Sequence, residues 1–237
     1  MFLYGKNSVL ERLQINPQTI RKIFLQTNFK EMNIAQIIKS KKIAVNTVTP
    51  KELMRIKNSS PLQGIVAEIE DFVYADFYEL LDKPADKRLT LIFLDRISDP
   101  QNLGAIIRIA ACFGGIGVVI PKHEACAVND TVLHVASGGE NFVPVAMVTN
   151  ITNALNEAKK TGYWVVGAVV EDGENIYNSI LPVPLALVLG SEGYGIRQGI
   201  QKHLDSKFRI PMQGADLSFN VTSACSIFCY EINRQLK

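Results

Sequence analysis

Three glycine-containing loops carry the residues whose types and spacing could do chemistry, and each loop follows an apolar segment. The first reads SDPQNLG and contains Asn102, and the second reads LGSEGYG and contains Glu192. The third reads IPMQGADLSFN and contains Ser218 and Asn220. Glycines at the end of a strand let backbone amides approach a ligand closely. The three loops are therefore predicted to bind a ligand.

These loops lack the patterns of the common nucleotide-phosphate sites. The chain has no G-x-x-x-x-G-K-[ST] sequence, and the spacing of Gly193, Gly195 and Gly199 misses the dinucleotide fingerprint by one residue. No acidic residue follows in a second strand–helix–strand unit. The pattern favours a ligand that is not held by its phosphates.

A charged residue interrupts the apolar segment that follows the first loop. The sequence Asp99-Pro100, with Asn102 as N-cap, predicts the start of a helix. Helical spacing then places one apolar stripe on its surface, made of Leu103, Ile106, Ile107, Ala110 and Phe113. At 100° per residue, Arg108 points away from this stripe. A lone exposed arginine is usually solvated, but its position after a buried strand favours a function.

The elements that position these loops alternate between strand and helix. After residue 89, continuous apolar runs typical of strands buried on both faces read LTLIFLD, GVVIP, YWVVGAVV and LALVLG. Helices are expected near 130–137 and 151–160 and after Ser218. The alternation predicts an α/β fold with a mainly parallel sheet and ligand sites at the carboxyl ends of the strands.

The first 75 residues are predicted to form a separate, smaller α/β domain. Strands are expected in RKIFLQ, KIAVNTV and QGIVAEI, and helices in EMNIAQIIKSK and PKELMRI. The polar segment DKPADKR, residues 82–88, reads as part of an interdomain linker. The predicted organisation is a domain over 1–75, a linker over 76–89 and a second domain over 90–237.

Composition sets further bounds on function. The chain has 237 residues, of which 47% are apolar and 20% charged, as expected of a globular protein. Its first apolar patch contains charges, and no run approaches the ~18 apolar residues of a membrane span, so a cytoplasmic protein is expected. The three histidines and four cysteines are scattered, which argues against a metal site. Cys112, Cys225 and Cys229 fall in apolar helical patterns and are expected to be small core residues.

The positive charge is concentrated near the N-terminus. Residues 1–75 hold 11 Lys and Arg against 6 Asp and Glu, whereas residues 90–237 hold 11 against 13. Nine of the basic residues lie between Arg21 and Lys57. This distribution is typical of a module that binds a polyanion, and equally of a lysine-rich solvated surface.

Three ordered motifs resemble those of the SpoU (TrmH-like) RNA 2′-O-ribose methyltransferases, of the SPOUT superfamily. They read DPQNLGAIIRIAACFG, LVLGSEGYGI and IPMQGADLSFNVTSACSIFCYE, and the resemblance covers roughly residues 90–237. Residues 1–75, with YGKNSVLERL and SSPLQGIVAEI, resemble the small L30e-like RNA-binding domain found before it in this family. The whole arrangement is most similar to the bacterial 23S rRNA guanosine 2′-O-methyltransferases.

The resemblance implies a set of site residues. Its catalytic residues correspond to Asn102, Arg108, Glu192, Ser218 and Asn220. Its S-adenosylmethionine pocket corresponds to Leu189, Gly190, Gly193, Ile210, Met212 and Phe219. The chain departs from the family at Phe219, where Leu is usual, and at Thr222, where Ser is common. The segment ASGGENFVPV also resembles the family, and its Glu140 is either a surface or a site residue.

The resemblance also implies an architecture and a partner. The second domain is expected to contain a trefoil knot, which general rules of chain connection do not predict. The protein is expected to act as a homodimer whose active sites are completed near the interface, with Arg108 left for substrate and the second subunit. Ser218 is equally a helix cap, and Lys6 and Asn7 either touch RNA or shape a turn.

The predicted activity is S-adenosylmethionine-dependent methylation of a ribose 2′-OH in 23S rRNA. Arg108 would hold a phosphate and stabilise the alkoxide, and because a guanidinium stays protonated, the residue that accepts the proton is left open. One alternative is a tRNA methyltransferase of the same chemistry. Another is a non-catalytic RNA-binding factor for ribosome assembly, which would not need to keep the five site residues.

Overall fold

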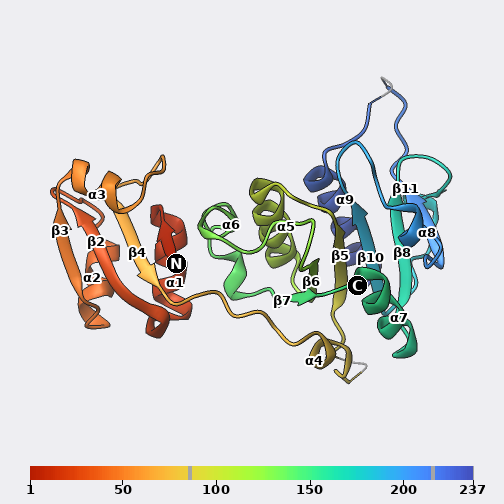
Figure 1. Ribbon diagram of the computed structural model, residues 1–237, viewed down its shortest axis with the longest axis horizontal. Coiled ribbons are helices and arrows are strands. Elements are labelled where there is room, and N and C mark those ends of the chain that lie inside the picture. The colour runs from red at the N-terminus through yellow and green to blue at the C-terminus, as the bar shows by residue number, and fades with distance from the viewer. Residues whose placement is uncertain (85–86, 215–216, 237) are drawn as a thin grey trace.

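The computed structural model describes residues 1–84, 87–214 and 217–236 (Figure 1). Its N-terminal part is a four-stranded sheet in the order β1-β4-β2-β3, in which β2 and β3 are parallel and the other pairs are antiparallel. The strands are β1 Phe2–Tyr4, β2 Ile20–Gln26, β3 Val45–Val48 and β4 Ile65–Ile69. The accompanying helices are α1 Lys6–Ile15, α2 Met32–Ser40 and α3 Pro50–Ile56. The predicted strands and helices of this part are confirmed.

The remainder of the chain is built on a parallel sheet of seven strands in the order β7-β6-β5-β10-β8-β11-β9. The strands are β5 Thr90–Asp95, β6 Ile116–Pro121, β7 Val145–Val148, β8 Trp164–Val169, β9 Glu174–Asn175, β10 Leu185–Gly190 and β11 Ser206–Arg209. The α/β fold with a parallel sheet is confirmed. The chain winds outward from β5 through β6 and β7, and then returns to the other side of β5, an arrangement that opens a crevice at the carboxyl ends of the central strands.

Helices cover both faces of this sheet. Packing places α5 Pro100–Phe113, α6 Asp130–Ala136 and α9 Val221–Gln235 on one face. It places α4 Phe77–Leu81, α7 Ile151–Lys160 and α8 Gln198–Gln201 on the other. The continuous apolar strands are explained by this double cover, since successive side chains point to opposite faces and both faces are buried.

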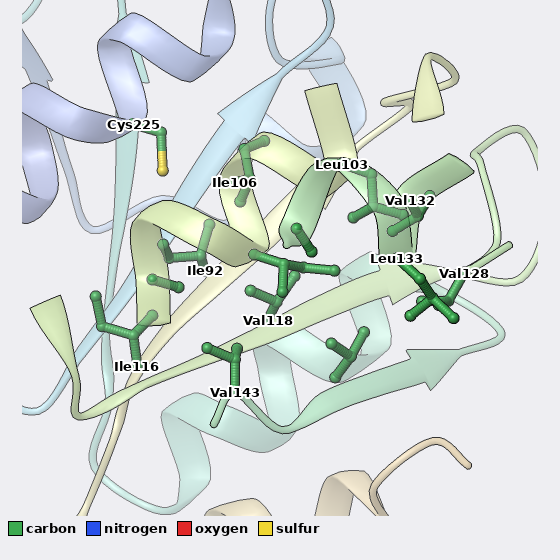
Figure 2. Packing of buried hydrophobic residues seen from close by; sticks show 14 of the residues in the cluster. Ile92, Leu103, Ile106, Ile116, Val118, Val128, Val132, Leu133, Val143 and Cys225 are labelled. Atoms are coloured by element: carbon green, nitrogen blue, oxygen red, sulfur yellow. The ribbon is translucent and has the colours of Figure 1, made fainter. Parts of the chain in front are cut away.

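Alternating residues of β5 show the two faces directly. Ile92 packs in the cluster under α5, α6 and α9, whereas Phe93 packs in the cluster under α4 and α7. Figure 2 shows Ile106 of α5 beside Ile92 and Val118 of the sheet, with Cys225 of α9 facing the same cluster. The apolar stripe of α5 therefore packs on its own sheet, as its spacing predicts.

Three details differ from the sequence-based expectations. Asp99, not Asn102, is the N-cap of α5, and its side chain accepts a hydrogen bond from the Gln101 amide at 2.8 Å. Because Pro100 takes the first helical position, the cap must precede it. Asn220, not Ser218, caps α9, which starts at Val221. Cys112 is exposed rather than buried, whereas Cys225 and Cys229 are core residues as expected.

The segments that join the two sheets are partly described. The predicted linker contains α4, which packs Phe77, Leu80 and Leu81 under the large sheet. Residues 85 and 86 of DKPADKR and residues 215 and 216 of the third loop lie outside the described residues. Within the described ranges, no helix has the length and apolar character needed to cross a membrane.

Figure 1 shows α6 between the N-terminal elements and α5. Apolar packing is continuous across this boundary, because one buried cluster includes Leu13 of α1, Leu133 of α6 and Ile107 of α5. The N-terminal part is therefore docked on the same face of the sheet that α5 covers.

Candidate active site

A cavity of about 410 Å³ lies at the carboxyl ends of β8, β10 and β11, beside the start of α9. Its walls include all the residues predicted to bind a cofactor: Leu189, Gly190, Gly193, Ile210, Met212 and Phe219. Glu192, Ser218 and Asn220 also line it. Sequence reasoning missed further wall residues, which include Val169 at the end of β8, Val170 after it, and Phe228 of α9.

The loop after β10 folds back tightly over the end of its own strand. The Gly195 amide donates to the Ser191 carbonyl at 2.9 Å, and Gly193 and Gly195 have φ angles of 82° and 62°. A Cβ on Gly190 would overlap the backbone of Gly195 and Ile196. The three glycines are thus explained by one close approach and two left-handed backbone conformations.

A buried carboxylate fixes the far end of this loop. Asp95, at the end of β5, is fully buried and accepts hydrogen bonds from the Arg197 amide at 2.9 Å and the Arg197 Nε at 2.7 Å. Arg197 also forms an ion pair with Glu124 at 3.0 Å. Sequence analysis did not single out Asp95, although a carboxylate that ends a buried strand was a usable signal.

Three of the predicted catalytic residues meet beside the cavity. Asn102, in the first turn of α5, donates from Nδ2 to Glu192 Oε1 at 3.0 Å. Asn220 donates to the same oxygen, and its Nδ2 also lies 3.5 Å from Asn102 Oδ1. This polar cluster joins residues from three loops that are up to 118 positions apart in the chain. Two amides hold the carboxylate of Glu192 in one orientation beside the cavity.

Asn220 also caps the N-terminus of α9. Its Oδ1 accepts from the Thr222 amide at 2.8 Å and from the Thr222 hydroxyl at 2.6 Å, so it caps α9 while its Nδ2 holds Glu192. The capping and site interpretations of this residue are therefore compatible. Ser218 is exposed on the wall of the cavity.

Arg108 lies apart from the polar cluster. It follows Asn102 by six residues, which is about 9 Å along the helix axis. Its side chain is exposed and lines a different cavity, between α5, α6 and the N-terminal part. Among the described residues, the side chain of Asn102 forms hydrogen bonds with Glu192 and Asn220 and none with Arg108.

Glu140 is neither a surface residue nor a wall of the cofactor cavity. Its carboxylate is fully buried and forms an ion pair at 2.9 Å with Arg12 of α1, whose side chain is 11% exposed. Burial raises the pKa of Glu140, and the Arg12 guanidinium offsets part of that rise. This pair, which sequence analysis missed, joins the N-terminal part to the larger sheet.

The glycines of ASGGENFVPV let this segment fit between two helices. A Cβ on Gly138 would overlap the Glu11 side chain of α1, and a Cβ on Gly139 would lie 3.1 Å from Arg108 Cα. The short turn Gly139–Asn141 is thus pressed against α5 at the position of Arg108. The N-terminal part is consequently linked to the helix that carries Arg108.

Lys6 and Asn7 occupy the start of α1. The Lys6 ammonium pairs with Glu31 at 2.6 Å, and its backbone amide donates to Gln63 Oε1 at 2.7 Å. Asn7 is exposed on the wall of the cavity that Arg108 lines. Among the described residues, no group of three or more His, Cys, Asp and Glu side chains is placed to hold a metal ion.

Comparison with known proteins identifies the family of both parts of the chain. Residues 89–230 match the SpoU rRNA methylase family, and residues 2–75 match the RNA 2′-O ribose methyltransferase substrate-binding family. A Staphylococcus haemolyticus protein, provisionally named a TrmH family tRNA/rRNA methyltransferase, is 35% identical over 238 residues. That alignment covers 98% of this chain and 95% of the relative.

Two solved structures show the same fold at low identity. The SpoU methyltransferase AviRb from Streptomyces viridochromogenes, in complex with the cofactor AdoMet, has a TM-score of 0.83 and 20% identity, covering 100% of this chain and 90% of that one. The AdoMet-bound rRNA methyltransferase from Sinorhizobium meliloti has a TM-score of 0.81 and 22% identity, covering 100% and 87%. The chain therefore belongs to the SpoU rRNA methylase family, and the RNA methyltransferase predicted from its three motifs is confirmed.

Proposed function

We propose that this protein transfers the methyl group of S-adenosylmethionine to the 2′-OH of a guanosine ribose in 23S rRNA. The observation that carries the proposal is the polar cluster of Asn102, Glu192 and Asn220, which lies beside a cavity lined by all six predicted cofactor residues. The match of residues 2–75 to a substrate-binding family of RNA 2′-O ribose methyltransferases supports the reaction.

The cavity fits S-adenosylmethionine in size and lining. Its volume of about 410 Å³ lies within the roughly 300–1,000 Å³ of small-molecule sites. Leu189, Ile210 and Phe219 would pack on the apolar parts of the cofactor. Position 190 must be glycine because a Cβ there would overlap the backbone of Gly195, so no side chain at this position projects into the site. When bound, the cofactor supplies an electrophilic methyl group on a sulfonium.

The residues of the polar cluster would position the ribose. Glu192 is held by two amides and presents its carboxylate beside the cavity, where it can accept a hydrogen bond from a hydroxyl. Arg108 would bind the adjacent phosphate and stabilise the developing alkoxide, because a guanidinium matches phosphate oxygens and remains charged. Ser218 would contact the substrate or the cofactor from the wall of the cavity.

A second copy of the chain would complete the site. Within one chain, Arg108 lies about 9 Å along α5 from Asn102 and lines another cavity. The exposed Tyr230 of α9 and Leu236, which follows the helix, offer apolar surface for a homodimer. Mixed dimers of Arg108→Ala and Glu192→Ala should therefore recover activity that neither variant has alone. Failure to recover it would place both residues in the same chain's site.

We propose domain boundaries at 1–75 for the substrate-binding domain, 76–89 for the linker and 90–237 for the methyltransferase domain. The family matches over 2–75 and 89–230 support these limits. The trefoil knot stays a prediction from the family resemblance, and the cytoplasmic location stays a prediction from the composition of the chain.

The proposed function is tested by transfer of labelled methyl from S-adenosylmethionine to unmodified 23S rRNA and to tRNA. The wild-type protein should label 23S rRNA, and Arg108→Ala should abolish the label while S-adenosylmethionine affinity stays unchanged. Label only in tRNA would keep the chemistry and change the substrate. Absence of label in both RNAs, with RNA still bound, would favour the non-catalytic RNA-binding factor.

A further inference from the structure

A second cavity, of about 570 Å³, lies between the N-terminal part and the helices α5 and α6. None of its described lining residues is acidic, and Arg108 contributes a permanent positive charge. Side-chain amides from both parts of the chain line it, namely Asn7 of α1, Gln63 before β4 and Gln101 of α5. The lining therefore suits a polar, anionic ligand.

The walls of this interdomain cavity are held together by direct contacts. The rings of Tyr4 and His134 stack with centroids 4.1 Å apart, and His134 Nδ1 lies 2.9 Å from the Tyr4 carbonyl. Asp130 accepts from the Phe2 amide at 3.0 Å and pairs with Lys57 at 2.5 Å. The cavity is thus preformed between two parts of the chain that are fixed relative to one another.

Several polar groups at the wall are available for a ligand. Over residues 1–84, 87–214 and 217–236, no side-chain hydrogen bond or ion pair is found for Arg108, Asn7 or Gln101. Gln63 uses Oε1 to accept from the Lys6 amide, which leaves its NH₂ group to donate. A guanidinium binds phosphate, and side-chain amides pair with the edges of bases.

We propose that the interdomain cavity binds an unpaired nucleotide of the RNA substrate next to the methylated one, with its phosphate on Arg108 and its base against Asn7, Gln63 and Gln101. The proposal rests on the function proposed above. A cavity of this volume admits a single nucleotide rather than a duplex. Sequence-specific recognition of RNA generally uses such unstacked bases, so this cavity would help to select the target.

A charge placed at Asn7 tests the proposal with a matched control. Asn7 is the second residue of α1, and Asn33 is the second residue of α2 in the same part of the chain; both are exposed. An acidic residue in the first turn of a helix is tolerated, so Asn7→Asp and Asn33→Asp should both fold. Gln101→Glu adds the same charge from the other wall.

The readouts are RNA affinity and the KM for RNA in methyl transfer, with S-adenosylmethionine affinity and melting temperature as checks on folding. Asn7→Asp and Gln101→Glu should weaken RNA binding about tenfold at low salt, through repulsion of phosphate and competition for Arg108. Asn33→Asp should change it less than twofold. Equal effects of Asn7→Asp and Asn33→Asp would overturn the proposed nucleotide site.

Two results separate this site from the reaction itself. A wild-type protein that binds RNA without transferring methyl refutes the proposed function, and the affinity comparison still decides the interdomain cavity. A wild-type protein that neither binds nor methylates 23S rRNA or tRNA refutes both proposals.

Discussion

The buried ion pair between Arg12 and Glu140 is predicted to fix the N-terminal part on the helix that carries Arg108. Replacing either partner by Met leaves a charge buried without its counter-ion, whereas replacing both leaves an apolar contact of similar size. The single variants Arg12→Met and Glu140→Met should each be clearly less stable than the double variant. The comparison is therefore a double-mutant cycle.

The expected magnitude follows from the geometry of the pair. At 2.9 Å and an effective dielectric constant of about 20, the gross attraction is about 6 kcal/mol, most of which is offset by desolvation. Losing one partner of a buried pair costs about 3–5 kcal/mol, and we expect about 3 here, because Arg12 is 11% exposed and also donates to Thr19 at 3.3 Å. The stability of the double variant should lie within about 1 kcal/mol of the wild type. Two atoms of the pair, Arg12 Nε and Glu140 Oε2, lack a hydrogen-bond partner among the described residues.

Thermal unfolding at pH 7 measures this difference. In a chain of this length, a loss of about 3 kcal/mol lowers the melting temperature by about 6–12 °C. Both single variants should also methylate RNA more slowly, while S-adenosylmethionine affinity is unchanged because neither residue lines the cofactor cavity. A coupling energy below about 1 kcal/mol would refute the view that this pair fixes the two parts of the chain.

Three further outcomes follow from the structure. Gly190→Ala should weaken S-adenosylmethionine binding at least tenfold in calorimetry, because its Cβ overlaps backbone. Gly199→Ala, whose Cβ has no neighbour within 4 Å in the described part of the chain, should bind normally. Asn220→Ala should lose about 1 kcal/mol of stability with its cap, while Asn220→Ser keeps a capping side chain but should still lose methyl transfer; full activity of the Ser variant would contradict a role beyond capping. Because the pKa of Glu140 is raised in the folded protein, the folded state binds the proton of this carboxyl group more tightly than the unfolded state does. The contribution of Glu140 to the free energy of unfolding therefore falls as the pH rises from the unfolded-state pKa of about 4.3 through the raised pKa of the folded state. Unfolding titrations of Glu140→Gln should lack that decline, and an identical pH dependence in both proteins would show that Glu140 is not buried in solution.

The local periodicity of the sequence was sufficient to predict most of the strands and helices of the fold. Apolar runs such as residues 89–95 predict strands buried on both faces, and the stripe on α5 predicts the face that packs on the sheet. The contact between Asn102, Glu192 and Asn220 could also be predicted from the sequence, because loops after parallel strands gather at one edge of a sheet.

Other features depend on contacts that no local pattern encodes. The Arg12–Glu140 pair joins positions 128 apart, and an arginine in an amphipathic helix ordinarily points to solvent. The separation of Arg108 from the polar cluster follows from the rise of the helix and was predictable in principle. The N-cap of α5 was also predictable, because proline favours the first helical position and Asp99 directly precedes Pro100.

The most direct test of the central claim identifies the atom that receives the methyl group. Unmodified 23S rRNA is incubated with the protein and labelled S-adenosylmethionine, digested to nucleosides, and analysed by mass spectrometry together with resistance of the adjoining linkage to alkali. The account predicts one labelled 2′-O-methylguanosine, absent when Arg108→Ala replaces the wild type. Label on a base, or a ribose label that persists in Arg108→Ala, would contradict it.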